Sequence, residues 1–117
     1  MRNETKTALQ ALTFLASIKE RMKVRDLAMA ENLHPAILAK TLQRLAYAGL
    51  LKSSKGPTGG FELSGSPTIA QVMKACGEEI ADLPYIGTEA FGAALIYRRS
   101  TTMEDLAKKP RGWGTVA

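Results

Sequence analysis

Residues 35–63 read PAILAKTLQRLAYAGLLKSSKGPTGGFEL, and this stretch decides the fold. Three leucines in its first half recur at i, i+4 and i+7, which places them on one face of a helix. They are Leu38, Leu42 and Leu45. Pro35 suits the first helical position because it has no N–H to leave unpaired, and Gly49 is favoured just past a helix end. The spacing therefore predicts a helix that begins at Pro35, buries a leucine ridge and is stopped by Gly49.

The side of this helix opposite the leucines is partly basic. At about 100° per residue, that side carries Ala36, Lys40, Gln43 and Tyr47, flanked by Ile37 and Arg44. A shorter helix from about Arg25 to Glu31 precedes it, and Asn32 tolerates the left-handed backbone that often ends a helix. Two short helices joined by a tight turn predict a helix-turn-helix, whose second helix enters the major groove of DNA.

A glycine-rich hairpin follows the second helix directly. Residues 50–54 and 61–63 can pair as short strands, and the segment between them is rich in the turn formers glycine and proline. Lys52 and Lys55 carry positive charge along this predicted wing. Glycines at its tip would let the backbone approach a phosphate or a minor groove closely, although an ordinary hairpin tip contains glycines too. They are Gly56, Gly59 and Gly60.

The predicted DNA contacts use side chains that suit bases or phosphates. Arginine can hold guanine, glutamine can hold adenine, and small apolar side chains can touch thymine methyl groups. The residues expected at DNA are Arg25, Ala36, Ile37, Lys40, Gln43, Arg44, Lys52, Lys55, Gly56, Gly59 and Gly60. Three alternatives stay open: Arg44 could pair with a nearby carboxylate, Tyr47 could pack against the first helix, and the whole face could be an ordinary solvated surface.

Further helices are predicted on both sides of this motif. They run from Glu4 to Ile18 with Asn3 as cap, from a capping box of Thr68 and Gln71 to Gly77, from about Glu89 to Arg99, and from a cap at Thr101 or Thr102 to Pro110. Residues 81–87 are predicted to form a loop because they include Pro84 and Gly87. The predicted fold is mainly α with a small β-hairpin, a winged helix-turn-helix followed by a C-terminal dimerisation helix.

The predicted helix from Glu89 to Arg99 is apolar on most of its sides. A surface helix of that kind must be covered, and a second subunit is the natural cover in so small a protein. The residues expected at this dimer interface are Phe91, Ala94, Leu95 and Tyr97. The chain then divides into a DNA-binding domain at 1–80, a C-terminal loop, dimerisation helix and closing helix at 81–110, and a tail at 111–117.

Composition narrows the classes of function. The 117 residues carry a formal net charge of +5, which suits a polyanionic partner such as nucleic acid. No run approaches the ~20 apolar residues of a membrane span, and the first residues lack an apolar signal segment, so a cytoplasmic protein without membrane contact is expected. No nucleophile–base pair, metal cluster or nucleotide-binding motif points to an enzyme.

The single histidine and the single cysteine are expected to be structural. His34 precedes Pro35 and is placed to cap or bracket the helix, and it has no second metal ligand at a suitable spacing. Cys76 lies on an amphipathic segment and is expected in the core rather than as a sensor thiol. A lone cysteine cannot form an internal disulfide, which indicates a reducing compartment.

Two motifs make the sequence resemble a known family. Residues 45–51 read LAYAGLL and residues 55–61 read KGPTGGF. Following a helix-turn-helix, they resemble the Rrf-two (Rrf2) family of bacterial winged-helix regulators, which includes the IscR, NsrR and CymR types and whose wing reads basic-Gly-Pro-X-Gly-Gly-aromatic. Residues 6–16 resemble the first helix of that family, and residues 100–107 resemble its closing motif.

The resemblance implies a homodimer that binds a palindromic operator in double-stranded DNA and commonly represses. Some members hold a 2Fe–2S cluster through three cysteines just before the dimerisation helix. The matching segment here, Glu78 to Gly87, contains no cysteine, so no cofactor is expected. The alternative function is a winged-helix protein-interaction module with weak or no DNA binding, because Ala36, Ile37 and Ala39 leave few polar base readers. A small-molecule or protein effector fits either function, and the sequence does not identify one.

Overall fold

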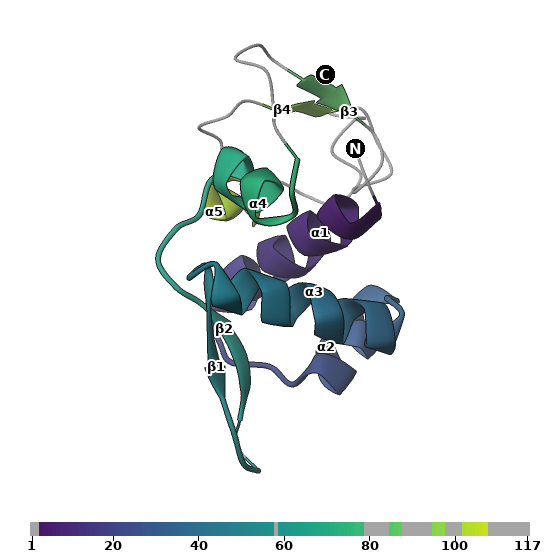
Figure 1. Ribbon diagram of the computed structural model, residues 1–117, viewed down its shortest axis with the longest axis vertical. Coiled ribbons are helices and arrows are strands. Elements are labelled where there is room, and N and C mark those ends of the chain that lie inside the picture. Colours follow the sequence, from purple (N-terminus) through teal and green to yellow (C-terminus); the bar gives the residue numbers. More distant parts are fainter. Residues whose placement is uncertain (1–2, 58, 79–84, 88–94, 98–101, 108–117) are drawn as a thin grey trace.

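A computed structural model of the chain describes residues 3–57, 59–78, 85–87, 95–97 and 102–107. The elements follow in the order α1 (Asn3–Ile18), α2 (Val24–Glu31), α3 (Pro35–Tyr47), β1 (Leu51–Ser54), β2 (Gly60–Leu63), α4 (Ile69–Ala75), β3 (Tyr85–Gly87), β4 (Leu95–Tyr97) and α5 (Met103–Ala107) (Figure 1). The predicted class, mainly helical with a small antiparallel hairpin, is confirmed. Among the described residues, no helix is both long and apolar enough to pass through a bilayer.

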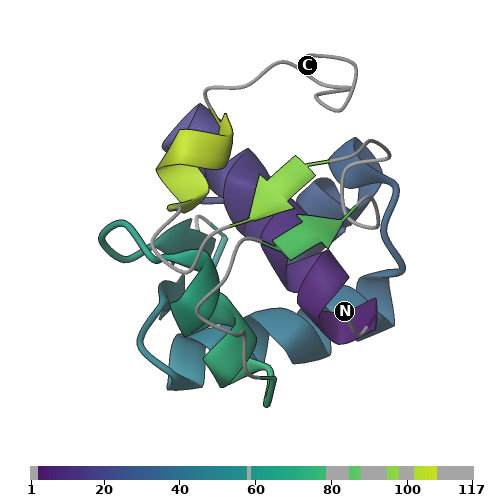
Figure 2. The same ribbon diagram turned by 90° about the horizontal axis from the view of Figure 1, so that it is seen from above.

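The helix α1 is the centre of the core. Its apolar side chains at 8, 9, 11, 12 and 15 are almost fully buried, and the other described helices all contact it (Figure 2). The prediction placed its start at Glu4 with Asn3 as cap, whereas Asn3 already lies within the helix. Because the other described helices all pack on α1, the core of the described residues is built around this helix.

The helix-turn-helix forms as predicted. Asn32 adopts the left-handed conformation at φ 53° that ends α2. His34 is the N-cap of α3, where its Nδ1 accepts a hydrogen bond from the Ile37 N–H at 3.5 Å, and Pro35 follows at the first helical position. Gly49 takes a φ of +85° just past the end of α3, which an L-residue with a side chain adopts only with strain.

The wing projects away from the helices (Figure 1). Its strands β1 and β2 pair antiparallel, with Leu51 opposite Leu63 and Lys52 opposite Glu62. The sequence did not predict a third extended segment at Met22. The Met22 N–H donates to the Phe61 carbonyl at 2.9 Å, and the Phe61 N–H donates to the Met22 carbonyl at 2.7 Å. This reciprocal pair attaches the base of the wing to the segment between α1 and α2.

The closing helix α5 belongs to the same core as the wing and the helix-turn-helix. Its Met103 and Leu106 are buried against α1, and the Met103 N–H donates to the Pro67 carbonyl at 2.9 Å. Thr102, one of the two predicted caps, forms a capping box with Asp105 at 3.0 and 3.1 Å. The predicted capping box of Thr68 and Gln71 is also present. The closing helix α5 therefore packs into the core that α1 forms with the other described helices.

The predicted helix from Glu89 to Arg99 is wrong over the part that the structure describes. Residues 95–97 form β4, which pairs antiparallel with β3 at residues 85–87, where a loop was predicted. A short apolar run such as Leu95-Ile96-Tyr97 fits a strand as well as a helix, and its β-branched and aromatic residues favour a strand once a partner is available. Phe91 and Ala94, two of the predicted interface residues, lie outside the described residues. Leu95 and Tyr97 lie in β4 instead of a dimerisation helix.

Candidate nucleic-acid interface

The outward face of α3 is open to solvent. The leucine ridge of this helix is fully buried, so the opposite side is held outward. The exposed residues on that side are Ala36, Ile37, Lys40, Gln43, Arg44 and Tyr47. Ile37 is 52% exposed and Tyr47 is 96% exposed, so the alternative that Tyr47 packs against the first helix is wrong. The described part of the chain therefore leaves this face free to meet another molecule.

The beginning of α2 adds positive charge beside α3. Arg25 is exposed in the first turn, as predicted, and the exposed Lys23 is the N-cap. The Lys23 side chain makes no capping hydrogen bond. Backbone N–H groups in a first turn without a side-chain cap can bind an anion, and the helix dipole favours negative charge there. Sequence reasoning missed Lys23, although the run Lys23-Val24-Arg25 at the start of a helix was the available signal.

The wing extends the basic surface, and its glycines have different roles. Lys52, Lys55 and Gly56 are exposed, which agrees with a tip that meets a partner. A Cβ at Gly59 would overlap the carbonyl of Ser54, and a Cβ at Gly60 would overlap the backbone of Met22. The close approach that Gly59 and Gly60 permit is thus to their own chain. These two glycines build the wing, and Gly56 remains the exposed glycine at its tip.

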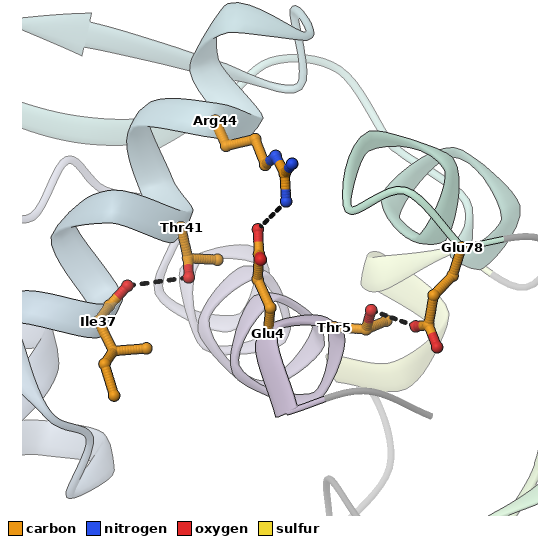
Figure 3. Close-up of polar contacts among 6 residues, drawn as sticks. All are labelled: Glu4, Thr5, Ile37, Thr41, Arg44 and Glu78. Carbon is orange, nitrogen blue, oxygen red and sulfur yellow. Dashed lines mark hydrogen bonds and ion pairs between the residues drawn. The ribbon is translucent and has the colours of Figure 1, made fainter.

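Arg44 forms the ion pair that the sequence left open. Its guanidinium donates to Oε1 of Glu4 in the first turn of α1 at 2.5 Å, and the side chains are 50% and 35% exposed respectively (Figure 3). This hydrogen bond, and then the charge of Glu4, raise the pKa of Arg44, so the guanidinium stays protonated. On the same edge of α3, the Thr41 hydroxyl donates to the Ile37 carbonyl at 2.9 Å. The partner carboxylate lies 40 residues away in the sequence, so no local signal could identify it.

Cys76 lies in the core at the end of α4, as predicted. Its side chain is fully buried, and burial raises the pKa of its thiol, with the Glu4 carboxylate raising it further. The thiol is therefore protonated at neutral pH, whereas a metal ligand must be a thiolate. Near it, the Thr5 hydroxyl donates to the Glu78 carboxylate. Within the described ranges, no three His, Cys, Asp or Glu residues come together as a metal site, and the whole sequence contains one cysteine. The described residues do not fit a cysteine-held iron–sulfur cluster.

Comparisons with known proteins agree with this geometry. A protein of Aquifex aeolicus (strain VF5), named as an HTH-type transcriptional regulator, is 36% identical over 75 residues, which are 61% of this chain and 52% of that protein. The chain thus spans about half the length of this curated relative.

Two solved structures show the same fold. CymR, the global cysteine regulator of B. subtilis, superposes with a TM-score of 0.70 at 23% identity, over 92% of this chain and 95% of that one. IscR of T. potens superposes with a TM-score of 0.67 at 19% identity, over 92% and 85%. The model of the Rrf2 family, described as iron-dependent transcriptional regulators, matches residues 1–90. Helix-turn-helix, basic wing and family match together place this chain in the Rrf2 family.

Proposed function

We propose that this chain is a sequence-specific DNA-binding transcriptional regulator that acts as a repressor and binds a palindromic operator as a homodimer. One observation carries the proposal: α3, whose exposed face is partly basic, contacts both α2, which begins with an uncapped first turn, and the projecting basic wing. A major groove is wide enough to admit such a helix. The family match supports the regulatory role, and the homodimer and the operator symmetry rest on the family resemblance.

The exposed side chains suggest a division of labour at DNA. Lys40 and Gln43 lie at the middle of the outward face, where they can reach base edges, and the apolar Ala36 and Ile37 suit thymine methyl groups. Arg25 lies beside the first-turn N–H groups of α2, which suits a phosphate. Lys52 and Lys55 on the wing suit the neighbouring phosphate backbone or groove of the DNA. Each phosphate neutralised in this way steepens the slope of the logarithm of the binding constant against the logarithm of the salt concentration by about 0.9.

Lys40→Ala is expected to weaken binding to a duplex selected from a random-sequence pool by about tenfold, because a base contact contributes roughly 1–3 kcal/mol. The dissociation constant is measured by fluorescence anisotropy at several salt concentrations, and the mass of the complex gives its stoichiometry. Lys74→Ala is the matched control, since Lys74 is an exposed lysine on α4. We expect this control to bind as the wild type does, and two chains to bind one duplex.

Three outcomes would contradict parts of this proposal. Equal losses of DNA affinity in Lys40→Ala and Lys74→Ala would show that α3 is not the helix that contacts the bases. One chain per duplex at saturation would contradict the homodimer. If the wild type selects no duplex even at low salt, the exposed Ile37 and Tyr47 would favour a protein-interaction module instead.

We also propose that this chain regulates without an iron–sulfur cluster. The support is its single cysteine, which is buried and held protonated. After anaerobic incubation with ferrous iron and sulfide, followed by desalting, the protein is expected to remain colourless and to retain less than about 0.1 iron per chain, because a cluster needs several thiolate ligands. A visible absorption band accompanied by stoichiometric iron would contradict this expectation.

A further inference from the structure

We propose that Glu4 competes with DNA phosphate for Arg44 and thereby sets the affinity of this chain for DNA. The inference rests on the proposed DNA-binding function. It adds a residue of α1, outside the helix-turn-helix and the wing, to those that determine affinity. The predicted effect is an unusual one, since removing a single carboxylate should improve binding rather than impair it.

The position of the ion pair makes it a competitor. Arg44 lies on the edge of the outward face of α3, one residue past Gln43, and half of its side chain is exposed. At an edge of a recognition helix, an arginine suits the phosphate backbone. In the structure the guanidinium instead donates to the Glu4 carboxylate (Figure 3). A DNA phosphate would have to replace this carboxylate or bind close to its negative charge.

The strengths of the two interactions favour the replacement of the Glu4 carboxylate by a DNA phosphate at Arg44. An exposed ion pair contributes little to the stability of a protein, since solvent and salt screen it. An arginine that binds a phosphate releases condensed counterions and gains affinity for DNA. Glu4 thus has a small effect on folding, while its charge opposes the approach of DNA to this edge of α3. Arg44 is a cation whose contribution depends on whether Glu4 holds it.

The residue next to Glu4 anchors the first turn of α1. Thr5 is fully buried, and its hydroxyl donates to Glu78, which follows α4. In Figure 3 the Glu4 side chain points toward α3, while that of Thr5 points toward the end of α4. The first turn of α1 therefore contacts α3 through Glu4 and the segment after α4 through Thr5. This arrangement also connects the end of α4 to the DNA-binding face.

The test measures the affinity of Glu4→Gln for the selected duplex across salt concentrations. We expect binding about three- to tenfold tighter than the wild type at low salt, and a salt slope steeper by up to about 0.9 per subunit as Arg44 gains a phosphate. Glu104→Gln is the matched control, because it makes the same change of charge at an exposed residue of α5, near the other end of α1. Thermal unfolding of each variant shows that the fold is unchanged.

The double variant Glu4→Gln/Arg44→Ala separates competition for Arg44 from general repulsion. The gain from Glu4→Gln should vanish when Arg44 is absent. A gain that persists in the Arg44→Ala background, or one no larger than that of Glu104→Gln, overturns the inference while leaving the proposed function intact. Tight binding by Glu4→Gln where the wild type binds weakly supports the inference. If neither protein binds any duplex, the proposed function fails, and the inference fails with it.

Discussion

Gly60→Ala is expected to lower the free energy of unfolding by about 2–4 kcal/mol. Gly60 has a φ of +139°, and a Cβ there would overlap the carbonyl of Met22. Strained backbone of this kind costs roughly 1–3 kcal/mol for a residue with a side chain. Met22 cannot simply move away, because it exchanges two backbone hydrogen bonds with Phe61, and losing them costs about 1 kcal/mol each. The measurement is urea denaturation followed by circular dichroism.

The wing should lose its position as well as its stability. Because the Met22–Phe61 pair attaches the wing to the segment between α1 and α2, Gly60→Ala should also weaken binding to the selected duplex by at least about tenfold, which corresponds to roughly 1.4 kcal/mol. Gly56→Ala is the control for stability alone, since Gly56 also has a positive φ, +91°, but a Cβ there would meet no atom within 4 Å. Only the backbone strain of about 1–2 kcal/mol applies to it. Similar unfolding midpoints for the two variants would exclude the overlap with Met22 as the cause.

The elements that the sequence predicted correctly are those specified by neighbouring residues. The leucine ridge, Pro35 and Gly49 define α3 within fifteen residues, and each acts through local geometry. The same holds for the capping box of Thr68 and for the left-handed Asn32. Local rules of this kind need no knowledge of the rest of the fold, and they were sufficient to place the recognition helix and the wing.

The features that the sequence did not predict depend on residues far apart in the chain. Met22 becomes a strand segment only because Phe61 pairs with it. The choice of Glu4 as the partner of Arg44 follows from the packing of α1 on α3. The strand at 95–97 was predicted as helix because a three-residue apolar run carries no decisive period. Tertiary context decided each of these cases: the sequence left open that Arg44 pairs with a carboxylate, but it did not identify Glu4 as the partner.

Membership of α5 in the main core leads to the second large effect. Leu106→Ala is expected to lower the free energy of unfolding by about 2–5 kcal/mol, the usual range for a buried leucine reduced to alanine. Leu106 is 1% exposed and packs with α5 against α1. A helix of five residues is too short to be stable alone, so its helicity depends on this packing. The cavity left by Leu106→Ala would therefore destabilise the whole domain.

Urea denaturation of Leu106→Ala beside Glu104→Ala tests whether α5 supports the DNA-binding domain or only the segment before it. Glu104 lies on the same short helix but is exposed, so its substitution should change the free energy of unfolding by less than about 0.5 kcal/mol. If α5 served only the association of two chains, Leu106→Ala would change the mass in solution and leave the unfolding of the isolated chain as it is. If α5 completes the core around α1, the unfolding midpoint falls, and DNA binding weakens with it because α1 also supports α3.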